Sequence, residues 1–92
     1  MMTLQEIYLK KSQFATRKVG KEMVLVPLKN NIATMDEMFT MNEVGCFIWE
    51  SIDGRNNENV ILTSVIEAFD IDLKTAEHDY DAFLESISKI MA

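Results

Sequence analysis

The sequence of 92 residues contains one cysteine, one histidine and only three glycines. Cys46 alone cannot form an internal disulfide, and its distance in sequence from His78 does not resemble the spacing of a zinc site. Gly20, Gly45 and Gly54 lie too far apart to form a glycine-rich phosphate loop. The sequence therefore gives no indication of an oxidising compartment, and we expect neither a metal nor a cofactor.

Long hydrophobic runs are also absent from this sequence. No stretch approaches the roughly eighteen apolar residues of a membrane span, and the N-terminal segment lacks an apolar run of signal-peptide length. The hydrophobic and charged fractions, 48% and 26%, are typical of a soluble globular protein. We therefore expect a single domain, residues 1–92, that is cytoplasmic and does not bind membranes.

Basic residues are scarce in the second part of the chain. Residues 1–29 hold six Lys and Arg against two acids, a net charge of +4, whereas residues 30–92 hold three against thirteen, a net charge of −10. A region this acidic would be repelled by a phosphate backbone, so we expect no nucleic acid partner.

The chain is organised around one apolar segment, Thr40–Gly54, which reads T-M-N-E-V-G-C-F-I-W-E-S-I-D-G. Asn42 is suited to cap the start of a helix, and Gly54 is suited to follow its end. The apolar residues between them recur at helical spacing. Because so short and apolar a helix is not stable alone in water, the rest of the chain must cover it.

Strands are predicted before this helix. Residues 14–19 and 22–28 are β-like and flank a turn at Gly20-Lys21, and a third strand is best placed at residues 38–41. Residues 1–12 have some helical spacing, but an extended conformation over the core is equally open.

Two further helices are predicted after it. Apolar residues recur at three- and four-residue spacing from Leu62 to Phe69, and again from Leu73 to Ile90, where Asp72 is suited to be the cap. The sequence thus predicts strands over about 14–41 and helices over about 42–91. This order indicates an α+β, winged-helix-like fold, with a three-stranded antiparallel sheet followed by a three-helix bundle.

No group of residues predicts catalysis. Cys46 lies on the apolar face of its helix, where a thiol usually packs as a small hydrophobic group, so a catalytic pair with His78 is disfavoured. The acids of the last helix are more simply explained as a solvated face. We therefore expect a protein that is not an enzyme.

Two kinds of binding remain. A winged-helix order allows a DNA-binding transcriptional regulator, although the predicted second helix has no basic residue. An exposed strand edge beside an apolar groove would instead capture an extended peptide. Three methionines, Met35, Met38 and Met41, surround the predicted edge and could adapt to a ligand, although packing in the core is the commoner role.

The segment M-N-E-V-G-C-F-I-W-E-S-I-D-G resembles the hallmark of the PqqD-like family of peptide chaperones, also called RiPP recognition elements. Arg17 with Gly20, the V-L-V-P-L run at residues 24–28 and the pattern of the last helix extend this resemblance. The residues that match the hallmark are Met41, Asn42, Glu43, Gly45, Ile48, Trp49, Ile52, Asp53 and Gly54.

The resemblance implies a non-catalytic chaperone that binds the leader segment of a ribosomally made precursor peptide. Such a protein presents the leader to a modifying enzyme, often a radical SAM protein, as in pyrroloquinoline quinone (PQQ) synthesis. The methionine-rich third strand and the few arginines before the first strand leave the pathway open. From the residues themselves, an exposed strand edge and a spare aromatic such as Trp49 permit a homodimer, for example by exchange of the N-terminal strands, without requiring one.

The resemblance also implies where the leader binds. It would add as a strand beside the third strand and lie over the last helix. The implied peptide-binding residues are Glu37, Met38, Phe39 and Thr40 on the strand, and Asp81, Leu84, Glu85 and Ser88 on the helix.

Overall fold

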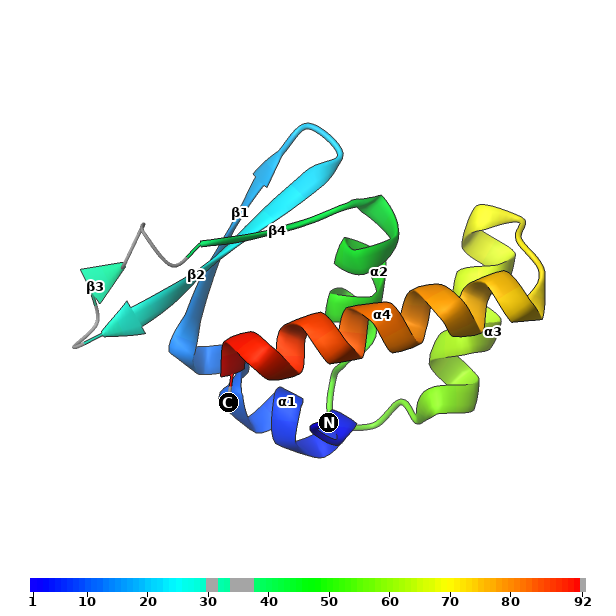
Figure 1. The fold of residues 1–92 in the computed structure, drawn as a ribbon, viewed down its shortest axis with the longest axis horizontal. Helices are drawn as coiled ribbons and strands as arrows, with labels where there is room; N and C mark the ends of the chain where they lie inside the picture. The colour runs from blue at the N-terminus through cyan, green and yellow to red at the C-terminus, as the bar shows by residue number, and fades with distance from the viewer. Residues whose placement is uncertain (30–31, 34–37, 92) are drawn as a thin grey trace.

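The computed structural model describes residues 1–29, 32–33 and 38–91. Its strands are followed by three helices, and one further short helix precedes the strands (Figure 1). The elements are α1 (Leu4–Lys10), the 3-10 turn η1 (Lys11–Gln13), β1 (Phe14–Val19), β2 (Glu22–Lys29), β3 (Ile32–Ala33), β4 (Phe39–Met41), α2 (Glu43–Ser51), α3 (Glu58–Phe69) and α4 (Leu73–Met91). The predicted α+β fold, with an antiparallel sheet followed by helices, is confirmed, and α1 is an addition to it.

The sheet is built around β2. Antiparallel β1 runs along it from the turn at Gly20, whose positive φ of 63° suits glycine. Strand β4 is also antiparallel to β2, with Thr40 opposite Val24, and the two residues of β3 pair with the end of β2. The hairpin and the third strand that the sequence predicted are therefore present.

The two faces of this sheet differ in their surroundings. Met23 and Leu25 of β2 and Met41 of β4 belong to the buried core that the helices complete. Val24 and Val26 alternate with them along β2, so their side chains point to the opposite face. The helical side of the sheet is therefore the core side.

The N-terminal segment, for which the sequence left a helix or an extended conformation open, is helical over α1. Thr3 and Glu6 form a reciprocal capping box at its start, and Ile7 is fully buried. The backbone N–H of Met2 donates to Ser88 Oγ at 3.0 Å, which fixes the start of α1 against α4. Local capping and one buried side chain thus select the helical alternative.

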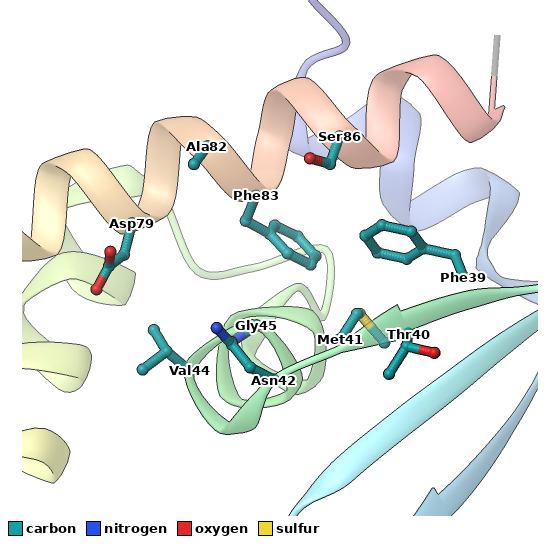
Figure 2. Close-up of a pocket in the computed structure, with 10 residues that line it drawn as sticks. All are labelled: Phe39, Thr40, Met41, Asn42, Val44, Gly45, Asp79, Ala82, Phe83 and Ser86. Carbon is teal, nitrogen blue, oxygen red and sulfur yellow. The ribbon is translucent and has the colours of Figure 1, made fainter.

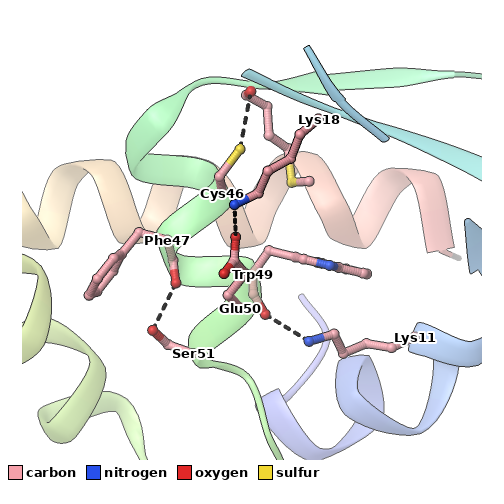
Figure 3. A network of polar contacts seen from close by, with 8 residues as sticks. Lys11, Lys18, Cys46, Phe47, Trp49, Glu50 and Ser51 are labelled. Atoms are coloured by element: carbon pink, nitrogen blue, oxygen red, sulfur yellow. Dashed lines mark hydrogen bonds and ion pairs between the residues drawn. The ribbon is translucent and has the colours of Figure 1, made fainter. Parts of the chain in front are cut away.

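Helix α2 begins as predicted but ends earlier. Asn42 accepts a hydrogen bond from Gly45 N at 2.8 Å, which confirms the cap, whereas the last helical residue is Ser51 and Gly54 lies beyond in a turn. Lys11 Nζ closes the helix end by donating to the carbonyl oxygen of Trp49 at 2.8 Å (Figure 3) and to that of Ile52 at 2.9 Å.

Trp49 belongs to the core rather than to an interface. Its side chain is only 4% exposed, and the Lys11 ammonium lies 4.7 Å from the centre of its ring. Trp49 is therefore not available for the dimer contact that the sequence left open.

Helix α4 contributes the longest buried stripe. Asp72 accepts a hydrogen bond from Thr75 N at 2.8 Å, which confirms the predicted cap. Leu73, which the sequence placed on the apolar face, is 54% exposed, so that prediction is wrong for this residue. The buried residues of α4 are Ala76, Tyr80, Phe83, Leu84, Ile87 and Met91.

None of the helices in the described part of the chain has the length and hydropathy that a membrane-spanning helix requires.

Candidate functional site

An open groove separates β4 from α4 (Figure 2). The aromatic rings of Phe39, from β4, and Phe83, from α4, point toward one another across it. Its volume is about 200 Å³. The lining residues are Phe39, Thr40, Met41, Asn42, Val44, Gly45, Asp79, Ala82, Phe83 and Ser86.

One edge of β4 faces this groove and pairs with no other strand that the structure describes. The other edge pairs with β2 through Phe39, Thr40 and Met41. No second strand in the described part of the chain pairs with β4. Such an edge presents backbone N–H and C=O groups that an added strand can bind.

Gly45 shapes the floor of the groove at the start of α2. A Cβ at this position would lie 3.3 Å from both Met41 Cβ and Asn42 Oδ1, and 3.5 Å from the ring of Phe83. A side chain would therefore crowd the corner between β4 and α2. The absence of a side chain at Gly45 keeps this corner open beneath Phe83.

The electrostatic character of the groove is acidic. Among the lining residues that the structure describes, Asp79 is the one with an ionisable side chain, and it lies at the end of the groove near Asn42 and Val44 (Figure 2). The other lining side chains are apolar or neutral. An apolar ligand with a basic group near Asp79 would match this lining.

The predicted strand residues are partly at this groove. Phe39 and Thr40 line it, whereas Met38 is 54% exposed and lines a separate hollow beside β1 and β2. Glu37 lies outside the described residues. The structure thus places two of the four predicted strand residues at the groove.

The predicted helix residues lie on the other flank of α4. Leu84 is only 7% exposed, and it lines, with Asp81, a different hollow at the start of α1. Ser88 accepts the hydrogen bond from Met2, and exposed Glu85 lies 3.6 Å from Lys89. A role in peptide binding for these four residues stays a prediction.

The groove is instead lined by a flank of α4 that the sequence prediction missed. Asp79, Ala82, Phe83 and Ser86 follow a three- and four-residue spacing, which places them on one side of the helix. Phe83 belongs to the apolar spacing from Leu73 to Ile90, which predicts only that its side chain is buried. The sequence did contain a signal for this flank, because the small Ala82 and the hydroxyl of Ser86 lie on the same side of the helix as Phe83.

The residues considered for catalysis do not form a site. Cys46 is buried, burial raises the pKa of its thiol, and its Sγ donates to the carbonyl oxygen of Met41 at 3.6 Å (Figure 3). His78 is exposed on α4. Over the described residues, no group of three or more His, Cys, Asp or Glu side chains could hold a metal ion. The burial predicted for Cys46 is therefore confirmed.

Comparison with known proteins identifies the family. No curated protein matches the sequence. The solved structure of TbiB1 in complex with the TbiA(beta) leader peptide shares the fold, with a TM-score of 0.64, 21% sequence identity and coverage of 84% of each chain. The model of the family described as coenzyme PQQ synthesis protein D (PqqD) matches residues 22–89. The chain therefore belongs to the PqqD family.

Proposed function

We propose that this protein is a non-catalytic peptide chaperone that binds the leader segment of a ribosomally made precursor peptide. It would present that leader to a peptide-modifying enzyme, such as a radical SAM protein. The observation that carries the proposal is the unpaired edge of β4 beside the groove against α4. Membership of the PqqD family supports it, and so does the leader peptide bound to TbiB1, which has the same fold.

The leader would bind as an added strand. Its backbone would form hydrogen bonds with the free edge at Phe39–Met41, and each such bond contributes about 1 kcal/mol. Alternate side chains of a strand point to opposite sides, so every second leader residue would enter the groove. The backbone contacts would give affinity for any extended peptide, and the groove would select its side chains.

The groove lining indicates which side chains are selected. A leucine- or isoleucine-sized side chain would contact the rings of Phe39 and Phe83, where it is shielded from water. A lysine or arginine nearby would pair with the carboxylate of Asp79. We therefore expect leaders that carry an aliphatic or aromatic residue with a basic residue close to it.

Titration with a synthetic leader tests this function. The genes that flank the gene of this chain are searched for a short precursor, its leader segment is synthesised, and binding is measured by calorimetry and by amide chemical shifts. We expect saturable binding with the largest shifts at Thr40, Ala82 and Ser86. Exposed positions of α3, such as Thr63 and Glu67, serve as the control. Absence of binding, or shifts centred on α3, would refute the proposal.

A gel shift with duplex DNA tests the alternative function, that of a DNA-binding transcriptional regulator. The net charge of −10 over residues 30–92 predicts no retardation even at low salt, where phosphate contacts are strongest. Binding that weakens steeply with salt would favour a DNA-binding regulator instead.

A further inference from the structure

The outer face of the sheet is unusually apolar. Ala15, Arg17 and Val19 of β1 lie opposite Val26, Val24 and Glu22 of β2, so these six side chains share one face. The core residues Met23 and Leu25 alternate with them, so the shared face points away from the core. Figure 1 shows the β1–β2 hairpin projecting from the helical part of the molecule.

This face contains a hollow of about 280 Å³. Val19 and Met38 at its rim are 57% and 54% exposed, and Val26 is buried although it lies outside the main core. An antiparallel sheet with one solvated face normally has polar residues there. Apolar side chains gathered on such a face are typical of an interaction surface. The lining residues are Ala15, Thr16, Arg17, Val19, Val24, Val26 and Met38.

We propose that this outer face is the docking surface for the peptide-modifying enzyme. An apolar side chain of the enzyme would enter the hollow between Val19, Val24 and Met38, and a carboxylate of the enzyme would pair with Arg17. The identity of this partner depends on the proposed chaperone function. The surface itself is defined by the hollow and by its charge.

The charge of this face argues against a second copy of the chain. Arg17 is the charged residue among the described residues that line the hollow, so a twofold contact centred on the hollow would bring the guanidinium groups of both copies into one apolar interface, where they repel one another. Contact with the acidic helical part of another copy would join different surfaces, and such contacts form open assemblies unless a ring closes. A different protein with an acidic, apolar patch avoids both problems.

The position of this face also suits the transfer of a bound leader. Val24, on the outer face of β2, pairs in register with Thr40 of β4, whose strand borders the leader groove. An enzyme docked on the hairpin would thus lie next to the bound leader while the groove against α4 stays open. The two binding events use different side chains and can be tested separately.

The genes that flank the gene of this chain are first searched for a peptide-modifying enzyme, and the test then compares two valine substitutions with that enzyme as the probe. Val19→Lys puts a charge at the hollow, whereas Val60→Lys makes the same change at a valine of α3 that is 44% exposed and far from the hollow in sequence. Biolayer interferometry measures enzyme affinity, and calorimetry measures leader affinity. We expect V19K to weaken enzyme binding by about tenfold or more and leader binding by less than about twofold. V60K should change neither affinity.

Arg17→Glu provides a second, charge-based measurement. We expect it to weaken enzyme binding and to reduce the salt dependence of that binding, because it removes the proposed ion pair. Leader affinity should again be unchanged.

Several results would overturn this inference. These are no binding of the enzyme to the wild-type chain, equal enzyme affinities of V19K and V60K, or a wild-type dimer that V19K converts to a monomer in ultracentrifugation. The last result would assign the face to a second copy. Enzyme binding that V19K weakens, together with no leader binding by the wild-type chain, would support the surface and refute the chaperone function.

Discussion

Substitution of Ala82 by tryptophan is the most direct test of the groove. Ala82 is an exposed residue of α4 that lines the groove beside Phe83 and faces β4. An indole at this position would occupy much of a hollow of about 200 Å³ and exclude a leader side chain. The fold should persist, because Ala82 is neither a core residue nor a helix cap.

The expected loss follows from the burial that the groove offers. Moving one leucine-sized side chain from water to an apolar site contributes about 1.5–3 kcal/mol. Loss of that contact would raise the Kd for the leader by about tenfold to a hundredfold. The backbone contacts to β4 would persist only if the leader can still approach the strand, so the lower end of this range is a minimum.

The measurement is calorimetric titration of A82W with the synthetic leader, beside A68W as the matched control. Ala68 is an exposed alanine of α3 that does not line the groove. Thermal unfolding verifies that both variants are folded. If folded A82W binds the leader as tightly as the wild type, the groove is not the leader-binding site. Equal losses of leader affinity in A82W and A68W would show that the effect is not specific to the groove.

Three predictions concern stability. Lys11→Met should lower the free energy of unfolding by about 2 kcal/mol in urea denaturation, because two carbonyl contacts at the end of α2 are lost; burial, which lowers the pKa of Lys11, offsets part of their contribution. An unchanged urea midpoint would contradict the proposed cap. Leu84→Ala should lower the free energy of unfolding by about 2–5 kcal/mol, because the residue is buried, and the leader affinity of the folded variant tests the predicted role of Leu84 in peptide binding. Weakened leader binding by folded L84A would place Leu84 at the leader site. Hydrogen bonds from the hydroxyl and backbone of Thr75 lower the pKa of Asp72, so its stabilisation is present above the ordinary pKa of 3.8 and is lost as the pH falls through the lower folded value. Asp72→Asn keeps an acceptor but does not titrate, so the fall in Tm between about pH 5 and about pH 2 should be smaller than in the wild type; an equal fall would contradict this role.

The sequence by itself determined the features that depend on neighbouring residues. Asn42 and Asp72 cap their helices as predicted, because a cap needs only a side-chain acceptor and the backbone N–H groups that follow it. Gly20 makes the turn of the hairpin for a similarly local reason, its positive φ. The segregation of strand patterns before helix patterns was sufficient to predict the α+β class.

Only the tertiary structure decided which flank of α4 borders the groove. The buried stripe of this helix has a polar flank on each side, one with Asp79 and Ser86 and one with Asp81 and Ser88, and the pattern does not distinguish them. The choice depends on where α1 packs. Because α1 is held against the second flank by the hydrogen bond from Met2 to Ser88, the first is left facing β4. That contact joins residues 86 positions apart, a separation that local sequence patterns do not encode.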